Sequence, residues 1–282
     1  MNLSIITVSW NVKDKLRECV KSVFENRGDL EIEYFVVDNA SCDGTANMLA
    51  SEFSQVRVIA NSENKGFARA NNQAIKQSTG EFVLLLNPDM RVLPETLPRM
   101  VAWMRAHARA GVASGKLLDE EGRINKEATP RHFPCFFDQA AIMLKVPHLF
   151  PHVLDHYLWR DFDAEKEQTV DSVRGSFFMI RREVLDALKG LDERYFIWFE
   201  EVDFCKQVWN ACFEVWYVPS VTCVDYVGQS FKQQTGMWRQ KQFTKSMVQY
   251  FEKWHPCAAA LALKLLRPLA LFLTWIFIKF KL

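Results

Sequence analysis

The chain has 282 residues, of which 49% are hydrophobic and 24% are charged. This length and composition predict one large domain, or one domain with an appendage, and exclude a disordered, collagen-like or low-complexity protein. The net charge of +1 is unevenly distributed, because residues 232–282 carry +8 and residues 1–231 carry −7. A basic, hydrophobic tail on a mildly acidic body indicates contact with an anionic membrane surface and not with nucleic acid.

The first half of the chain alternates strand patterns and helix patterns that are joined by short loops. In chain order, the patterns predict strand 3–9, helix 12–25, strand 32–37, helix 46–53, strand 56–60, helix 68–77 and strand 81–86. Strand-helix-strand units of this kind form right-handed crossovers. They predict an α/β fold with a mainly parallel, Rossmann-like central sheet and helices on both faces.

The second half of the chain is less regular. Its patterns predict helix 94–108, strand 111–116, a helical piece near 136–144, strand 170–181, helix 182–188, helix 196–211 and one or two strands over 214–227. Four prolines break residues 120–164 into short pieces. We therefore expect an irregular region over the edge of the sheet there.

Residues 232–282 are predicted to form a basic, amphipathic helical region. Its most apolar stretch is 269–278, and Lys264, Arg267 and Pro268 interrupt anything longer. A transmembrane helix needs about 20 apolar residues, so we expect a helix that lies on the membrane surface. The N-terminus shows no signal-peptide pattern, and seven scattered cysteines indicate free thiols in a reducing compartment. These features predict a cytoplasmic protein held peripherally on the cytoplasmic face of the cell membrane.

Polar loops follow four predicted strands, at the edge where sheets of this kind bind ligands. The loops are Ser9-Trp10-Asn11, Asp38-Asn39, 61–66 and Asn87-Pro88-Asp89. Asp38 can accept a hydrogen bond from the ring N–H of uracil or thymine, and Asp89 can hold a divalent cation against a diphosphate. The alternative to these binding roles is purely structural: Asp38-Asn39 could form an Asx turn, and Asn87-Pro88-Asp89 could form a simple β-turn. No glycine-rich dinucleotide motif, P-loop or nucleophile elbow occurs in the sequence.

Six ordered motifs resemble the family 2 glycosyltransferases, in particular the rhamnosyltransferase-like group of O-antigen and cell-wall glycan enzymes. The motifs are 8–11, 37–45, 64–72, 84–89, 175–182 and 190–205. The resemblance covers about residues 3–231. It implies a GT-A fold over 1–231, with a nucleotide-sugar-binding half over 1–115 and an acceptor and catalytic half over 116–231. It also implies a nucleoside-diphosphate-sugar donor and Mg or Mn as the metal.

For the donor, the resemblance implies that Asp38 reads the base and that Thr7 and Ser9 line the nucleoside pocket. Residues 64–66 are implied to lie against the ribose and the diphosphate. The complete set expected to bind the donor is Thr7, Ser9, Asp38, Asn39, Asn64, Lys65, Gly66, Asn71 and Asn87.

For the metal, the stretch Asn87-Pro88-Asp89 stands where the family has its D-x-D motif. The first acid is an amide here, so Asp89 is the expected ligand. The family often has a His in the strand before a G-x-S element, but this chain has Asp225 in the corresponding strand. Asp225 is therefore a second candidate ligand for the metal.

For catalysis, the run 199–203 matches an acidic motif whose second acid is the general base, which implies Glu201. An inverting transfer needs a carboxylate that takes the proton of the attacking hydroxyl. Asp203 is the alternative base and Glu200 completes the catalytic set, although acids also suit a helix N-terminus without any catalytic role. The residues expected to contact the acceptor are Gly175, Ser176 and Trp198.

The expected function is an inverting, metal-dependent transfer of a single sugar to a hydroxyl of a lipid-linked or polysaccharide acceptor. The processive Q-x-x-R-W motif is absent from the sequence. The first-choice donor is dTDP-rhamnose, and a UDP-hexose or UDP-N-acetylhexosamine is the alternative, because one acid cannot distinguish uracil from thymine. A non-catalytic, membrane-attached nucleotide- or glycan-binding module stays open as well, since Glu201 replaces the usual Asp and the His is missing. A nucleotidyltransferase would need a glycine-rich loop after the first strand, which Ser9-Trp10-Asn11 is not.

Overall fold

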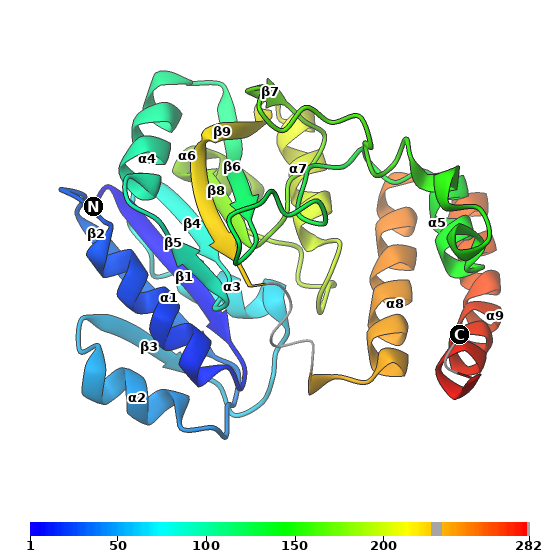
Figure 1. The fold of residues 1–282 in the computed structure, drawn as a ribbon, viewed down its shortest axis with the longest axis horizontal. Helices are drawn as coiled ribbons and strands as arrows, with labels where there is room; N and C mark the ends of the chain where they lie inside the picture. The colour runs from blue at the N-terminus through cyan, green and yellow to red at the C-terminus, as the bar shows by residue number, and fades with distance from the viewer. Residues whose placement is uncertain (227–232, 281–282) are drawn as a thin grey trace.

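The computed structural model describes residues 1–226 and 233–280, and within them a nine-stranded sheet is covered by helices on both faces (Figure 1). The strands are β1 (Leu3–Ser9), β2 (Ile32–Asp38), β3 (Val56–Ala60), β4 (Phe82–Leu86), β5 (Met90–Val92), β6 (Ala110–Leu118), β7 (Gln168–Thr169), β8 (Phe177–Arg181) and β9 (Glu214–Asp225). The helices are α1 (Lys13–Glu25), α2 (Thr45–Glu52), α3 (Phe67–Ile75), α4 (Thr96–Ala106), α5 (Phe136–Met143), α6 (Arg182–Leu188), α7 (Glu200–Asn210), α8 (Gly236–Trp254) and α9 (Cys257–Phe280). Two 3-10 turns, Val146–His148 and Pro151–Leu154, follow α5.

The predicted α/β fold and its mainly parallel sheet are confirmed, although β5, β7 and β8 run antiparallel to the other strands. Its strand order is β3-β2-β1-β4-β8-β6-β9-β5, with β7 paired to β9. The strands β3, β2, β1 and β4 are mutually parallel, as predicted. The strand β8 is antiparallel to both β4 and β6. The long segment 119–176 starts and ends at the same edge of the sheet, so β8 runs back against its neighbours without a helical crossover.

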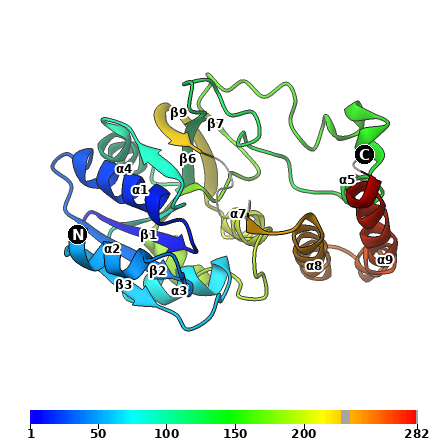
Figure 2. The same ribbon diagram turned by 60° about the horizontal axis from the view of Figure 1, so that its bottom comes forward.

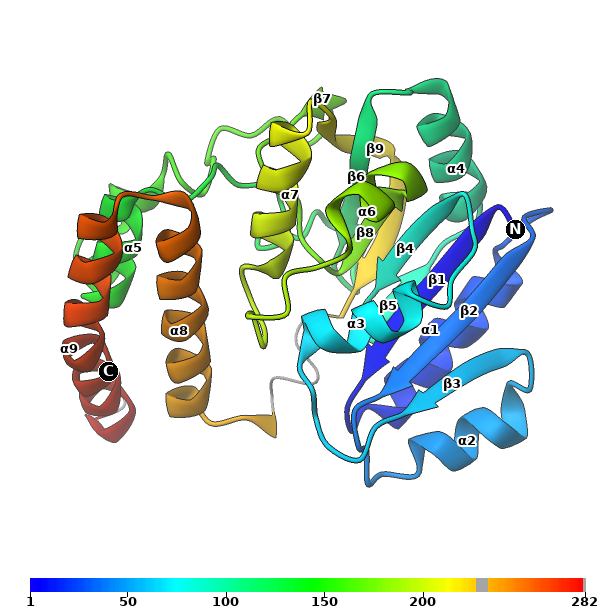
Figure 3. The same cartoon turned by 180° about the vertical axis from the view of Figure 1, so that it is seen from behind.

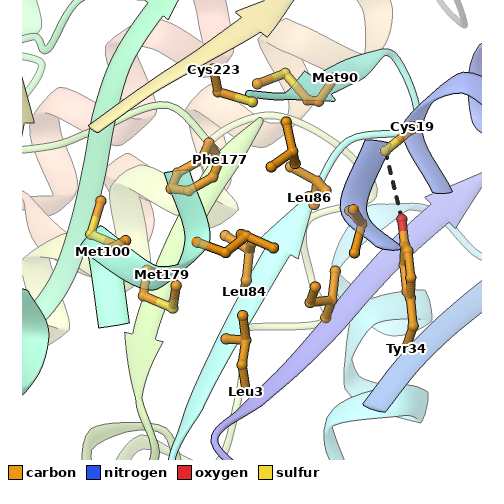
Figure 4. Close-up of a cluster of buried hydrophobic side chains, with 14 of the residues drawn as sticks. Leu3, Cys19, Tyr34, Leu84, Leu86, Met90, Met100, Phe177, Met179 and Cys223 are labelled. Carbon is orange, nitrogen blue, oxygen red and sulfur yellow. Dashed lines mark hydrogen bonds between the residues drawn. The ribbon is translucent and has the colours of Figure 1, made fainter. Parts of the chain in front are cut away.

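Two apolar cores lie on opposite faces of the sheet because alternate strand residues point to opposite sides. Helices α1, α2 and α4 cover one core, part of which Figure 4 shows around Leu84 and Met179. Helices α3, α6 and α7 cover the other core (Figure 3). The central strands β1 and β4 are buried on both faces, and β4 is accordingly a continuous apolar run.

Some predicted elements of the second half differ in the structure. The segment 170–176 is not a strand, because Ser172 and Asp171 bond instead to the segment 131–133. Residues 214–225 form one long strand, β9, and the short strands β5 and β7 pair with it. Neither short strand has a sequence pattern long enough to be read from alternation.

The C-terminal region is helical, as predicted, but α9 continues through the residues that were expected to interrupt it. The side chain of Arg267 donates hydrogen bonds to Thr244 Oγ1 (3.2 Å) and to the carbonyl oxygen of Lys241 (3.2 Å). Leu263 and Ala270 are buried on either side of Pro268. These contacts hold the residues on both sides of Pro268 against α8. The helix therefore continues although Pro268 has no backbone N–H to donate. By length and composition, α9 is the one helix in the described ranges that could cross a membrane.

Helices α8 and α9 pack beside the sheet domain as an antiparallel pair, with α8 next to α7 and α9 next to α5 (Figures 1 and 2). A third apolar cluster joins them to the rest of the chain. It includes Met143, Tyr195, Phe199, Met247, Phe251 and Leu263. The predicted boundary between 231 and 232 lies outside the described residues, and the division into 1–231 and 232–282 stays a prediction.

Candidate active site

A cleft opens at the carboxyl edge of the parallel strands, where the start of β8 also lies. Its volume is about 260 Å³. The predicted site residues that line it are Asn39, Asn64, Gly66, Asn87, Asp89, Gly175, Ser176, Trp198, Glu200, Glu201 and Asp225. Segments far apart in the sequence therefore converge at the edge where α/β sheets bind ligands.

The other predicted site residues do not line this cleft in the described part of the chain. They are Thr7, Ser9, Asp38, Lys65, Asn71 and Asp203. Thr7 is buried in β1, where its hydroxyl lies 2.9 Å from the hydroxyl of Tyr34. The carboxylate of Asp38 accepts a hydrogen bond from the amide of Ser41 (3.2 Å), which is the predicted alternative of an Asx-type turn. The donor-binding roles of these side chains stay predictions.

Two buried carboxylates, those of Asp89 and Asp225, line the cleft. Asp89 lies in the turn before β5, and Asp225 ends β9, which pairs with β5 through Met90. The amide of Tyr226 donates to the carbonyl oxygen of Asp89 (3.0 Å), which holds the two chain segments together. Carboxylate oxygens are the ligands that Mg and Mn prefer, so this pair fits such a cation. No group of three His, Cys, Asp or Glu that could hold a metal occurs in residues 1–226 and 233–280, so substrate and water would have to supply further ligands.

The loop 64–66 is held in a fixed shape beside these acids. The side-chain amide of Asn39 donates to Asn64 Oδ1 (3.2 Å) and to the carbonyl oxygen of Gly66 (3.2 Å). Gly66 has a φ of +80°, and a Cβ there would collide with the carbonyl oxygen of Phe196. Only glycine therefore suits this position. The next amide, that of Phe67, donates to the same Phe196 carbonyl (2.7 Å), so the loop contacts the segment that leads to α7.

The segment 175–176 forms the floor of the cleft opposite this loop. The amide of Asn87 donates to the carbonyl oxygen of Ser176 (2.9 Å), which aligns the end of β4 with the start of β8. A Cβ on Gly175 would lie 3.6 Å from Cβ of Glu201. The hydroxyl of Ser176 has no hydrogen-bond partner among the described residues. A small residue beside Glu201 and a free buried hydroxyl are consistent with a place for a substrate.

A strained turn presents the acids of α7 to the cleft. Trp198 and Phe199 have φ values of 64° and 70°, in the left-handed region that bulky residues rarely occupy. Each such residue costs on the order of 1–3 kcal/mol, which the surrounding structure has to offset. Phe199 is buried in the third apolar cluster, which supplies that support. The turn places Glu200 and Glu201 in the first turn of α7, and both line the cleft.

Burial raises the pKa of both glutamates. The pKa of Glu200 is raised well above its ordinary value by burial and, after that, by the charge of Glu201. Burial also raises the pKa of Glu201, while the positive charge of Arg174 opposes this shift and favours the ionised form. Oε2 of each glutamate has no hydrogen-bond partner among the described residues. A carboxylate with an elevated pKa and an unpartnered oxygen in a cleft suits a proton acceptor.

Residues 4–189 match the sequence model of the family described as Glycosyl transferase family 2. This chain belongs to that family. The match ends before α7. The family model therefore does not cover Glu200 and Glu201, and only their position in the cleft makes them candidates for the site.

Curated relatives of this family member carry names from glycan biosynthesis. The chain is 26% identical over 211 residues to the N-acetylglucosaminyl-diphospho-decaprenol L-rhamnosyltransferase of Mycobacterium tuberculosis, covering 71% of this chain and 68% of the relative. It is 26% identical over 209 residues to a low-salt glycan biosynthesis hexosyltransferase of Haloferax volcanii, covering 72% of this chain and 60% of the relative. These relatives support the predicted rhamnosyltransferase-like group.

Solved glycosyltransferases share the fold. The mannosyltransferase PcManGT of Pyrobaculum calidifontis, in complex with GDP-Man and Mn²⁺, superimposes with a TM-score of 0.61 at 21% identity, covering 98% of this chain and 73% of that one. The TarS 1-349 fragment of S. aureus, in complex with UDP-GlcNAc, gives a TM-score of 0.59 at 17% identity, covering 88% of this chain and 65% of that one. The GT-A fold predicted from the sequence is thereby confirmed.

Asp203, the alternative base, is fully buried between α7 and α8 in this glycosyltransferase family member. Its carboxylate accepts hydrogen bonds from Trp254 Nε1 (2.6 Å) and Gln207 Nε2 (2.8 Å) and pairs with Lys253 Nζ (2.8 Å). These contacts place its carboxylate in the packing between the helices, whereas Glu200 and Glu201 line the cleft.

Arg174, Gln234 and Trp238 are among the cleft residues that sequence reasoning did not assign to the site. Arg174 directly precedes the Gly175-Ser176 motif, and this position was a signal that could have found it. Gln234 and Trp238 come from the C-terminal region, which the sequence assigned to membrane contact alone. Trp238 lies in the first turn of α8, where its amide donates to the N-cap Thr235 Oγ1 (3.1 Å).

Proposed function

We propose that this protein is an inverting, metal-dependent glycosyltransferase that moves one sugar from a nucleoside-diphosphate sugar to a hydroxyl of a lipid-linked or polysaccharide acceptor. The observation that carries the proposal is the placement of two groups of carboxylates around one cleft. Asp89 and Asp225 come from the sheet edge, and Glu201 comes from the first turn of α7. One side therefore suits a cation and a diphosphate, and the other side suits proton transfer.

In the proposed reaction, the acceptor hydroxyl oxygen attacks the anomeric carbon while the bond from that carbon to the diphosphate breaks. Glu201 takes the hydroxyl proton, and Arg174 keeps its carboxylate ionised for this task. A cation held by Asp89 and Asp225 would neutralise charge on the leaving diphosphate. Trp198 lines the cleft beside Glu201, where its ring can stack on a sugar.

The proposed first-choice donor is dTDP-rhamnose. The name of the Mycobacterium relative supports the rhamnosyl group. Asp38, at the end of β2, is the proposed reader of the pyrimidine base, and the fixed loop 64–66 is the proposed support for the ribose and diphosphate. UDP-sugars are the competing donor class, because the same carboxylate can accept from the N3–H of uracil or of thymine.

The proposed acceptor is carried by a lipid, and the protein is proposed to lie on the cytoplasmic face of the membrane. One long face of α9 exposes large apolar side chains, and an adjoining group lies around α5 and the 3-10 turns. The exposed residues are Leu261, Leu265, Leu269, Phe272, Trp275 and Ile278 on α9, and Phe137, Leu149, Phe150 and Val153 in the adjoining group. The opposite face of α9 is packed on α8 through Leu263 and Ala270. A helix with one face against protein and one apolar face outward favours an interfacial position over a span.

A thermal-shift panel tests the donor site. The ligands are UDP, dTDP, GDP and ADP, each with and without Mg or Mn, on the wild type, Asp89→Ala and the exposed control Asp29→Ala. A ligand at about 100 times its Kd stabilises the folded state by about 2.7 kcal/mol. We expect a metal-dependent shift with one pyrimidine diphosphate that Asp29→Ala keeps and Asp89→Ala loses. No shift with any nucleotide would contradict the donor site and leave the binding module as the better function.

A further inference from the structure

A second, basic groove lies between the active-site cleft and the C-terminal helices. Its volume is about 690 Å³, and α8 and α9 supply one of its walls. Four cationic side chains line it, those of Arg131, Lys145, Arg174 and Arg239, whereas no Asp or Glu in the described ranges does so. We call this cavity the basic groove.

No salt bridge joins a cation of the basic groove to a carboxylate in the described ranges, although the charges of Arg174 and Arg131 act on Glu201. The Lys145 ammonium contacts the side-chain oxygen of Gln240 (3.4 Å), and the Arg131 guanidinium contacts the carbonyl oxygen of Glu127 (3.4 Å). The side chains of Arg174 and Arg239 have no hydrogen bond or ion pair within the described residues. Burial lowers the pKa of Lys145, because removing its charged ammonium from water costs free energy. Four cations around a cavity that no carboxylate lines are the pattern of an anion-binding site.

The basic groove communicates with the proposed catalytic base. Arg174 and Trp198 line both the cleft and the groove. A smaller cavity of about 50 Å³ lies between them and is lined by Glu201, Arg131 and Phe243, among others. A ligand whose anionic group sits in the groove can therefore extend past Phe243 toward Glu201.

The other side of the basic groove is apolar. Thr274, Phe277 and Ile278 line it from the last turns of α9. Ile278 is also half exposed and belongs to the outward apolar face of that helix. A ligand that carries an anionic group next to a hydrocarbon chain would thus meet cations in the groove and an apolar surface at its exit.

We propose that the basic groove binds the phosphate or diphosphate group of a lipid-linked acceptor, with its sugar directed toward Glu201 and its hydrocarbon chain along α9. This inference rests on the proposed glycosyltransferase function. One guanidinium group can donate two parallel, charge-assisted hydrogen bonds to two oxygens of a phosphate. Arg131, Arg174 and Arg239 therefore suit a group with several anionic oxygens. Such a ligand also offsets the mutual repulsion of the four cations.

The first test compares two acceptors that carry the same sugar. One is linked through a diphosphate to a short polyprenyl chain, and the other is the neutral octyl glycoside. The proteins are the wild type, the double variant Lys145→Gln/Arg239→Gln, and the control Lys245→Gln, which removes an exposed charge on α8 outside the groove. We expect the double variant to raise KM for the diphosphate acceptor about tenfold or more with little change in kcat, and to leave KM for the glycoside unchanged. Equal effects on both acceptors, or a wild type that uses both equally well, would overturn the proposal.

A binding measurement separates this proposal from the proposed function. Farnesyl diphosphate and farnesol are titrated into the full-length wild type and the same variants without a donor. We expect the diphosphate to bind the wild type and Lys245→Gln more tightly than the double variant, and farnesol to distinguish none of them. If this holds while no donor binds, the glycosyltransferase function fails and the anion site stands. If donors bind but the diphosphate does not prefer the wild type, only the groove proposal fails.

Membrane phospholipids are the other source of lipid phosphate. Vesicles of phosphatidylcholine alone and of phosphatidylcholine with phosphatidylglycerol are therefore compared in sedimentation experiments. We expect the double variant and Lys245→Gln to bind each vesicle type alike. A loss of vesicle binding that is specific to the double variant, together with an unchanged KM for the diphosphate acceptor, would assign the groove to membrane headgroups instead.

Discussion

The ammonium of Lys253 on α8 lies 2.8 Å from the carboxylate of Asp203 on α7. The same ammonium lies 3.0 Å from the carboxylate of Asp192, in the segment that leads to α7. Asp203 is fully buried, so this pair is a fixed link between the C-terminal helices and the helix whose first turn carries Glu201. The C-terminal region therefore supports α7, which carries the proposed catalytic base, in addition to any contact with a membrane.

Replacing Lys253 by Met should destabilise the fold. The change leaves Asp203 buried without its cation, and breaking a buried pair in this way costs about 3–5 kcal/mol. Chemical denaturation measures the loss, with Lys245→Met on the exposed side of α8 as the matched control. The double variant Asp203→Asn/Lys253→Met should regain much of the lost free energy. A single variant as stable as the control would show that the link contributes little.

Replacing Glu201 by Gln should abolish most turnover without loss of donor binding. Gln cannot accept the hydroxyl proton, and general-base catalysis is worth about 10²–10⁴-fold. Steady-state kcat measures the effect, the thermal shift with the nucleotide checks the donor site, and Glu63→Gln in an exposed loop is the control. Glu201→Asp keeps a carboxylate and should recover part of the rate. Near wild-type turnover in Glu201→Gln would assign the base to another group.

The pH dependence of turnover should report the charge of Arg174. The active form of Glu201 is ionised, so kcat falls as the pH drops through the raised pKa of this residue. Arg174, and more weakly Arg131, lowers that pKa, whereas burial raises it. Arg174→Gln should therefore move the acidic limb of the kcat profile to higher pH by roughly one unit, and Arg174→Lys should move it less. An acidic limb that stays in place would contradict the proposed pairing.

Replacing Glu200 by Gln should stabilise the fold at neutral pH. Burial raises the pKa of Glu200 in the folded state above its ordinary value of 4.5. Glu200 therefore ionises more readily in the unfolded chain than in the folded chain. As the pH rises from about 4.5 to the folded-state pKa, this difference lowers the free energy of unfolding. Gln cannot ionise, so the Glu200→Gln variant should have a free energy of unfolding about 1–3 kcal/mol higher than the wild type at pH 7 and almost the same at pH 4. Denaturation at both pH values is the measurement, and an equal gain at both would rule out ionisation as the cause.

The outward face of α9 should control membrane binding. Leu265 and Phe272 are 72% and 55% exposed, and each buried side chain of this size contributes about 1.5–3 kcal/mol. The double variant Leu265→Ser/Phe272→Ser should therefore bind phosphatidylcholine–phosphatidylglycerol vesicles more than tenfold more weakly in sedimentation experiments. Val58→Ser, an exposed apolar position on β3, is the control. Unchanged binding of the α9 variant would place the membrane contact elsewhere or exclude it.

Local sequence patterns were enough to predict the parallel strands β1 to β4 and the loops that follow them. Alternating strand and helix patterns leave few arrangements for β1, β2, β3 and β4, because crossovers are right-handed and strand ends meet at one edge. Asp89 and Glu201, which the sequence singles out in short motifs next to element ends, both line the cleft, and their roles stay predictions. Local sequence patterns are enough to indicate a candidate site residue when that residue lies within a few positions of the end of a strand or the start of a helix.

The packing partners of the C-terminal helices could not be predicted from the sequence. An amphipathic pattern indicates that one helix face is buried, but it does not identify the partner. The pairing of Lys253 with Asp203, the entry of Trp238 into the cleft and the gathering of Arg131, Lys145 and Arg239 all join residues far apart in the sequence. Long-range packing sets these contacts, and it makes part of the expected membrane appendage a wall of the cleft.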